Sequence, residues 1–250
     1  MATYLNKKPG LQAEVVDCVA EKLGYDALLA RIEHSMPETV GISSTTFTLI
    51  DTLKTARIVK NWRQGVHVCI GGPHVRIYPH ETMLHPNVDS VIAGEAEIAF
   101  SNLLQKIETG ESIEGLPGVL YRGADGIVRG NDQAQYVYDL DTIPFPDRSL
   151  INNELYWSVI GETRPSSTLM TSRGCPYRCR YCLHDRRYRC RSVSSVVEEI
   201  RHCLSLGIRE IFFFDESFAA NRAHAKQLCE AIISNGLRFK WHVRIRVNSI

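Results

Sequence analysis

Residues 174–191 read "GCPYRCRYCLHDRRYRCR" and carry four of the eight cysteines of this 250-residue chain. Cys175, Cys179 and Cys182 have the spacing C-x3-C-x2-C, and they follow a predicted strand over 167–172. Barrels and doubly wound folds place their chemistry on loops that follow the carboxyl ends of parallel strands. The cysteine loop is therefore a candidate site.

Composition excludes several classes of protein. No run approaches the roughly 20 apolar residues needed to span a bilayer, and the polar start "MATYLNKKPG" lacks the apolar stretch of a signal peptide. We therefore expect a cytoplasmic protein, in which a cysteine cluster is more often a metal or catalytic site than a set of disulfides. The formal net charge of +1 argues against a general nucleic-acid binder.

Two kinds of metal site compete for the cysteines. A structural zinc ion takes four ligands, typically in two close pairs, and would use Cys179 and Cys182. His184 and Cys190 are further candidate ligands, but they do not form the usual second pair. An iron–sulfur cubane bound by three thiolates instead leaves one iron open to a substrate or cofactor. The spacing favours the cluster, and a zinc-stapled module that binds RNA through its arginines is the alternative.

With Tyr181 just before its last cysteine, the motif resembles the signature of the radical S-adenosylmethionine (SAM) superfamily. The resemblance implies a [4Fe-4S] cluster held by Cys175, Cys179 and Cys182, with SAM chelated by the open iron. One electron from the cluster then cleaves SAM to a 5′-deoxyadenosyl radical. Tyr181 is one of the residues that the resemblance places at SAM.

The stretch "FFFDESFAAN" (212–221) ends the second predicted barrel strand. At this position the family carries a motif that contacts the SAM amino group, which assigns Asp215 and Glu216 to SAM binding. They replace the glycine-rich form common in the superfamily, so Asp215 or Ser217 capping a turn is an equal alternative. Arg244 and Arg246 share a face of the third predicted strand, where they line the barrel or pair with acidic neighbours.

The first half alternates short β-branched runs with amphipathic segments, which is typical of parallel strands joined by crossover helices. The predicted strands cover 13–18, 39–43, 66–70 and 89–93, and the predicted helices cover 25–34, 48–64 and 97–107. The start "MATYLNKK" is similar to the tail of a first helix. We therefore expect a doubly wound, Rossmann-like domain that lacks its first strand, in a chain truncated at both ends and poorly stable alone.

After this domain the pattern changes twice. "LPGVLYRGADGIVRGN" predicts a β-hairpin, and "YDLDTIPFPDRSLINNELY" a connector. Three β/α units then begin a partial TIM-like barrel, with strands at 167–172, 209–215 and 239–248 and helices at 192–207 and 221–236. The expected domains are 1–112 for the Rossmann-like domain, 113–163 for hairpin and linker, and 164–250 for the barrel half.

Three segments of the first domain resemble cobalamin-binding domains of one radical SAM branch: "VGISSTTFT" (40–48), "CIGGPHVRIYPHE" (69–81) and "VIAGEAE" (91–97). Glycines after strands let a backbone approach a flat macrocycle. The resemblance assigns nine residues to cobalamin: Ser43, Ser44, Thr45, Gly71, Gly72, Pro73, His74, Gly94 and Glu95. The Asp-x-His-x-x-Gly motif is absent, so either cobalt's lower face has no histidine or binding has been lost. A structural hydrogen bond is the commoner role for His74.

Taken together, the chain resembles cobalamin-dependent radical SAM enzymes, nearest to the anaerobic magnesium-protoporphyrin monomethyl ester cyclase-like group. The resemblance implies methylation, cyclisation or related radical chemistry on a small-molecule, tetrapyrrole or lipid-like substrate. The implied cofactors are a [4Fe-4S] cluster, SAM and cobalamin, and the implied reductant is a flavodoxin- or ferredoxin-type protein. A catalytically silent fragment is a third possibility.

Overall fold

The computed structural model describes residues 1–182 and 185–249. The chain divides into two compact units, residues 1–13 with 17–137 and residues 138–250 with 14–16. His184, a candidate zinc ligand, lies outside the described residues. None of the helices described is long and apolar enough to cross a bilayer.

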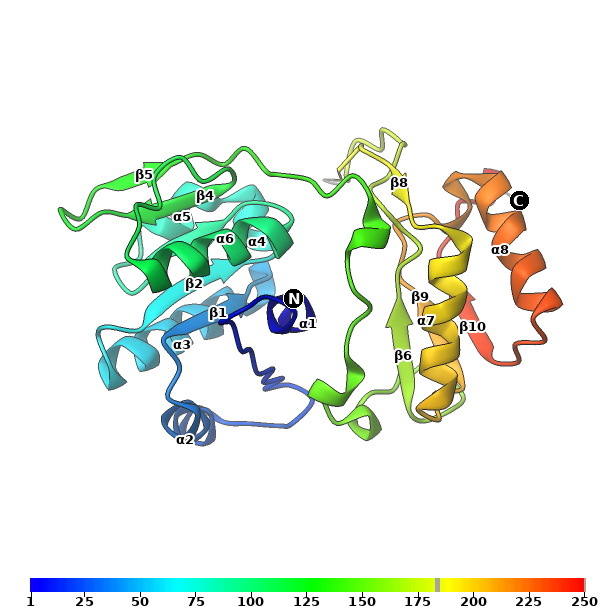
Figure 1. The fold of residues 1–250 in the computed structure, drawn as a ribbon, viewed down its shortest axis with the longest axis horizontal. Coiled ribbons are helices and arrows are strands. Elements are labelled where there is room, and N and C mark those ends of the chain that lie inside the picture. The colour runs from blue at the N-terminus through cyan, green and yellow to red at the C-terminus, as the bar shows by residue number, and fades with distance from the viewer. Residues whose placement is uncertain (183–184, 250) are drawn as a thin grey trace. The chain divides into compact units, whose positions relative to one another are not determined.

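The first unit contains one five-stranded sheet in the order β1-β2-β3-β4-β5 (Figure 1). The first three strands are parallel, and the last two are antiparallel to their neighbours. The strands are β1 (Thr39–Ser43), β2 (His67–Gly71), β3 (Ser90–Ile92), β4 (Val119–Arg122) and β5 (Val128–Gly130). The strands predicted at 39–43, 66–70 and 89–93 and the predicted hairpin are thus confirmed, and the hairpin extends this same sheet.

Consecutive residues of a strand point to opposite faces of the sheet. Both faces are apolar here, and helices cover each of them. Cys69 packs in a cluster with Leu103, whereas its neighbour Ile70 packs with Val75 and Met83. The helices are α1 (Ala2–Asn6), α2 (Tyr25–Ser35), α3 (Leu49–Trp62), α4 (Pro73–Ile77), α5 (Pro79–Met83) and α6 (Ala96–Thr109). This mixed α/β, Rossmann-like unit confirms the expected fold class.

The strand predicted at 13–18 is wrong. These residues form irregular backbone and a turn, in which the Asp17 carboxylate accepts hydrogen bonds from the N–H groups of Val19 (3.1 Å) and Ala20 (3.0 Å). Within the described part of the chain β1 pairs only with β2, and no strand pairs with 13–18. The two valines before Asp17 favour an extended strand, but none of the strands described pairs with them, so no strand forms.

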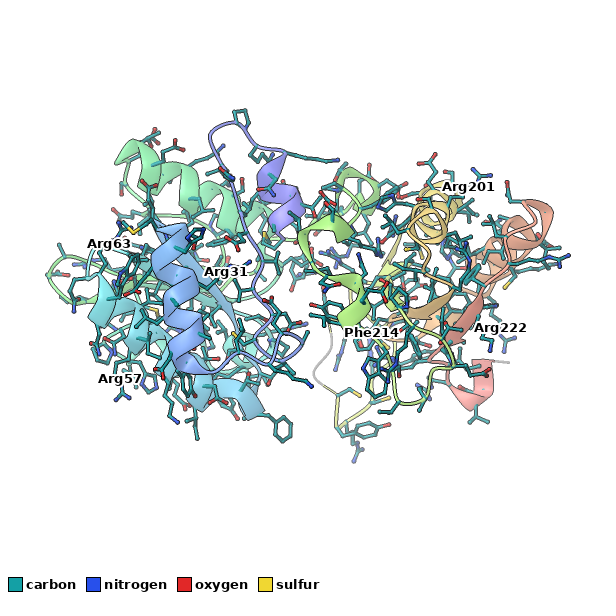
Figure 2. The ribbon with its side chains drawn as sticks, turned by 90° about the horizontal axis from the view of Figure 1, so that it is seen from below. Arg31, Arg57, Arg63, Arg201, Phe214 and Arg222 are labelled. Carbon is teal, nitrogen blue, oxygen red and sulfur yellow. The ribbon has the colours of Figure 1, made fainter. Side chains whose placement is uncertain are left out.

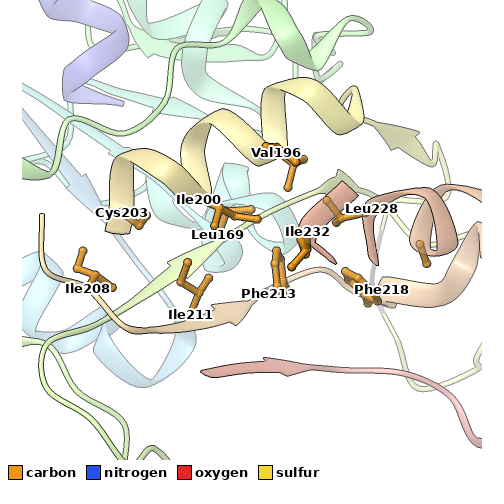
Figure 3. Packing of buried hydrophobic residues seen from close by; sticks show 12 residues of the cluster. Leu169, Val196, Ile200, Cys203, Ile208, Ile211, Phe213, Phe218, Leu228 and Ile232 are labelled. Carbon is orange, nitrogen blue, oxygen red and sulfur yellow. The ribbon is translucent and has the colours of Figure 1, made fainter. Parts of the chain in front are cut away.

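The second unit contains three parallel strands in the order β6-β9-β10, as expected for the start of a barrel. The strands are β6 (Ser166–Leu169), β9 (Glu210–Phe213) and β10 (Lys240–Val243), connected by α7 (Val193–Ser205) and α8 (Arg222–Ser234). The helices bury Ile200 and Leu228 against Ile211 and Phe213 of the central strand (Figure 3). A short antiparallel pair, β7 (Ser172–Arg173) with β8 (Arg189–Cys190), flanks the cysteine loop.

The connector to the second unit has three 3-10 turns, η2 (Leu140–Thr142), η3 (Arg148–Leu150) and η4 (Asn153–Leu155). Arg148 is buried and donates to Ser167 Oγ (3.0 Å), to the Thr168 carbonyl (3.1 Å) and to Glu199 Oε1 (2.8 Å). Glu199 Oε2 also pairs with Arg191. The charge network attaches the connector to β6 and α7, so it is part of the second unit's core.

The environment of Glu210 makes the stability of the folded chain depend on pH. Its carboxylate is buried, which raises its pKa, but N–H groups of Thr163 (2.7 Å) and Glu162 (2.8 Å) and the His242 ring (2.7 Å) outweigh burial and lower the pKa from 4.5 to about 2. Since the folded-state pKa is depressed, this contribution to stability is complete above about 4.5 and is lost as the pH falls through about 2.

We expect Glu210→Gln to flatten the pH dependence of the free energy of unfolding across that interval, measured by urea titration of the full chain. The matched control is Glu198→Gln, an exposed position on α7. Identical pH profiles for wild type and Glu210→Gln would contradict the prediction.

Candidate functional site

The cysteine loop is closed by backbone contacts at its base. The β7–β8 ladder pairs Arg173 with Arg189, and the Cys175 N–H donates to the Asp185 carbonyl at 2.7 Å. Gly174 adopts φ +79°, and a Cβ there would lie 2.4 Å from the Arg187 carbonyl oxygen. Only glycine fits this position, which the sequence analysis missed although the glycine directly precedes the first cysteine.

The three predicted cluster ligands share this one loop. Cys175 and Cys179 are half-buried, Cys182 is exposed, and the Cys182 N–H donates to the Cys179 carbonyl (3.2 Å). Burial, followed by the charges of Cys179, Cys175 and Glu216, raises the pKa of the Cys182 thiol. Cys175 and Cys179 thus both act electrostatically on the Cys182 thiol.

Cys175, Cys179 and Cys182 are thiols of the kind that ligate an iron–sulfur cluster, and such a cluster contains its own bridging sulfides. Among the residues that the structure describes, no three His, Cys, Asp or Glu side chains are already arranged to hold a metal ion. Cys190 lies on β8, opposite Ser172, and so belongs to the ladder at the base of the loop. Three thiols on one closed loop, none of them fully buried, are compatible with a cluster ligated by three cysteines, and that role stays a prediction.

Asp215 holds the end of β9 to the start of the cysteine loop. It is fully buried, and Oδ1 accepts from the N–H of Thr171 (2.9 Å) and the N–H and hydroxyl of Ser172 (2.5 and 2.8 Å). Burial raises the pKa of Asp215, although these hydrogen bonds oppose the shift. Its Oδ2 is buried and has no partner among the described residues.

The alternative in which Asp215 or Ser217 caps the following turn is wrong. Ser217 makes no capping hydrogen bond with its side chain, and α8 is capped by Asn221, which accepts from the His224 N–H at 3.1 Å. Glu216 is exposed and acts electrostatically on Cys182. Tyr181 is 89% exposed. Glu216 and Tyr181 are thus the accessible members of the three residues assigned to SAM, and their role stays a prediction.

Two loops at the carboxyl edge of the first sheet interlock. The Ser44 N–H donates to the Gly71 carbonyl (2.8 Å), and the His74 N–H donates to the Ser44 carbonyl (3.0 Å). Gly72 has φ +97°, and a Cβ there would lie 2.8 Å from the Ser44 carbonyl oxygen. The Thr45 hydroxyl caps the turn that follows, by accepting from the Thr48 N–H. Seven of the nine residues assigned to cobalamin, 43–45 and 71–74, therefore lie together.

Gly94 and Glu95 follow β3 and contact a different segment of the same unit. Glu95 Oε2 accepts from the Val137 N–H (3.0 Å), and a Cβ on Gly94 would lie 2.4 Å from the Ala134 side chain. These contacts bring the chain after the hairpin back against the sheet. A direct role of Gly94 and Glu95 in cobalamin binding stays a prediction.

His74 has the structural role that the sequence favoured. Its side chain is 3% exposed, and Nδ1 lies 3.2 Å from the Thr46 hydroxyl. Nε2 is buried without a partner among the described residues. The hydrogen bond between Thr46 and Nδ1 joins the first loop to the second. The sequence analysis missed Thr46, whose hydroxyl only becomes a partner once the two loops meet.

Comparison with known proteins adds to this geometry. Residues 1–104 match the family described as the B12 binding domain. The first unit thus contains a segment similar to that family. Its interlocked loops after β1 and β2 are the segments that carried the resemblance, and the Rossmann-like sheet is the fold that the resemblance implied.

Relatives match across both units. An uncharacterised methyltransferase of Pyrococcus horikoshii is 34% identical over 243 residues, which cover 94% of this chain and 52% of the relative. The cytidylyl-2-hydroxyethylphosphonate methyltransferase of Streptomyces wedmorensis is 27% identical, covering 86% and 46%. The chain therefore spans about half the length of these curated relatives.

A solved structure extends the likeness to the whole fold. The cobalamin-dependent S-adenosylmethionine radical enzyme OxsB, with aqua-cobalamin and S-adenosylmethionine bound, has a TM-score of 0.80 at 19% identity, over 96% of this chain and 34% of that chain. The first unit and the three β/α units that follow it thus each have a counterpart in the fold of that enzyme.

Proposed function

We propose that the protein is a cobalamin-dependent radical SAM methyltransferase in which Cys175, Cys179 and Cys182 hold a [4Fe-4S] cluster. The observation that carries this proposal is the closed loop that gathers these three thiols beyond the first strand of a parallel sheet. The relatives from Pyrococcus horikoshii and Streptomyces wedmorensis, which cover 94% and 86% of this chain, are methyltransferases, and they favour methyl transfer over cyclisation. The cyclase-like assignment is the less supported alternative.

The residues of the loop and its neighbours have separate tasks in this proposal. Asp215, with Gly174, fixes the shape of the loop. Glu216 and Tyr181 lie exposed beside the cysteines, where a carboxylate and a phenol hydroxyl are available to the ammonium of SAM. Ser43, Thr45 and residues 71–73 are at least partly exposed, and glycines there would allow close approach of a macrocycle.

When bound, the cluster would supply single electrons to SAM, and cobalamin would carry the methyl group. The protein's part is to bind and orient these groups and to shield them. We further propose a flavodoxin- or ferredoxin-type reductant, a small-molecule, tetrapyrrole or lipid-like substrate, and a cytoplasmic location. The predicted limits of 1–112, 113–163 and 164–250 give way to the two compact units, because the hairpin belongs to the first sheet and the connector from residue 138 belongs to the second unit.

Anaerobic reconstitution of the full chain with iron and sulfide tests the proposal. We expect a broad visible absorbance that bleaches on reduction with dithionite, about four irons per chain as a cubane requires, and 5′-deoxyadenosine when SAM is added. Titration with hydroxocobalamin tests the other site separately. Stoichiometric zinc without the iron–sulfur band would overturn the cluster assignment and favour the zinc-stapled module.

A further inference from the structure

Arg246 makes two contacts with the cysteine loop. Its guanidinium lies over the Tyr177 ring, 4.1 Å from the ring centroid, and its Nη1 lies 3.8 Å from Cys179 Sγ. β10 ends at Val243, so Arg246 belongs to the irregular segment after the strand. The prediction that 239–248 is one strand, with Arg244 and Arg246 on a single face, is therefore wrong.

Arg244 is a natural comparison because it is two residues away and contacts other groups. Its guanidinium lies 3.9 Å from the centroid of the Phe214 ring, and its Nη2 donates to the Phe214 carbonyl at 3.2 Å. Figure 2 labels Phe214, whose side chain is 55% exposed in the second unit. Both arginines are exposed and stacked on an aromatic ring, but within the described part of the chain only Arg246 of the two donates to a cysteine sulfur.

A guanidinium beside a ligand sulfur has a definite electrostatic consequence. Arginine stays protonated at all relevant pH values, so its positive charge is constant. A cluster gains one negative charge on reduction, and nearby cations and N–H groups that donate to its sulfurs favour the reduced form. The stack on Tyr177 also fixes the backbone between the first two cysteines, which limits how far Cys179 can move.

We propose that Arg246 is a positioning residue for the cluster: it donates to Cys179 Sγ, holds the loop through Tyr177, and raises the cluster's reduction potential. This inference rests on the proposed function, because it requires a cluster on Cys175, Cys179 and Cys182. It concerns the side chains of this chain only and does not depend on which substrate is used.

The test is a redox titration of the reconstituted full chain, monitored by electron paramagnetic resonance, without SAM or substrate. We expect Arg246→Gln to lower the ratio of reduced to oxidised cluster about tenfold at the wild-type midpoint, equivalent to about 59 mV for one electron. Arg246→Lys keeps the charge but loses the planar fork, so its shift should be smaller. Arg244→Gln should match the wild type.

The outcomes separate this inference from the proposed function. A wild-type midpoint in Arg246→Gln, at full iron content, overturns the inference and leaves the proposed function intact. Cluster loss in Arg246→Gln that Arg246→Lys reverses supports the positioning role, whereas cluster loss in Arg244→Gln as well overturns it. If the wild-type chain takes up no cluster at all, the proposed function fails and the inference fails with it.

Discussion

Replacing Cys182 with alanine is expected to abolish the iron–sulfur absorbance of the reconstituted chain and with it all cleavage of SAM. A cubane held by three thiolates has no protein donor to spare, so loss of one ligand leaves two irons without protein ligation. Cys182 is the exposed member of the trio, which makes its side chain the one whose loss disturbs packing least. Iron and sulfide content, visible absorbance and 5′-deoxyadenosine formation measure the effect.

Cys190→Ala is the matched control, because Cys190 lies only eight positions further along the same segment. It is half-buried on β8, opposite Ser172, and we expect its replacement to leave iron content at the wild-type level. The reverse pattern, with a full cluster in Cys182→Ala and none in Cys190→Ala, would show that the ligands have been assigned wrongly.

If the proposed function holds, Gly72→Ala is expected to weaken cobalamin binding more than tenfold while also destabilising the first unit. Its φ of +97° is unfavourable for any side chain, and a Cβ would lie 2.8 Å from the carbonyl oxygen and 2.9 Å from the amide nitrogen of Ser44. Such strain costs about 1–3 kcal/mol, and relief requires the loops after β1 and β2 to separate. Hydroxocobalamin titration and urea unfolding measure the two effects.

Gly110→Ala is the matched control, because it adds a side chain at a positive φ without adding a steric clash. Gly110 follows α6 with φ +69°, but no atom lies within 4 Å of the position its Cβ would take. We expect this variant to lose some stability and to bind hydroxocobalamin as tightly as the wild type. Wild-type affinity in Gly72→Ala would mean that the interlocked loops are not where cobalamin binds.

Much of the fold follows from local sequence. The spacing of β-branched runs and amphipathic helices placed β1, β2, β3 and the three barrel strands, and Gly207 and Gly236 follow α7 and α8 with left-handed φ of +81° and +62°. Strand ends were less accurate: the third barrel strand stops at Val243, five residues before its predicted end. Residues 13–18 have strand propensity, yet no neighbouring strand pairs with them.

The candidate site also has residues that the sequence predicted and residues whose role only the structure revealed. The spacing of Cys175, Cys179 and Cys182 and the glycines of the 71–74 turn are contiguous motifs, so residue order was enough to find them. Asp215 looked like a ligand-binding carboxylate beside Glu216, but it is buried and its Oδ1 is occupied by Thr171 and Ser172. Nothing in the local pattern distinguishes these two acids, because burial depends on what packs around them.

Residue order thus determined the class of fold, the cysteine loop and the turn at 71–74, because periodicity, glycine positions and motif spacing are properties of neighbouring residues. Only the tertiary structure decided that His74 is an internal partner of Thr46, that Asp215 holds the loop, and that Arg246 lies against Cys179. These contacts join positions from 28 to 67 residues apart. Chain folding brings them together, and no local pattern encodes which distant side chain will meet which.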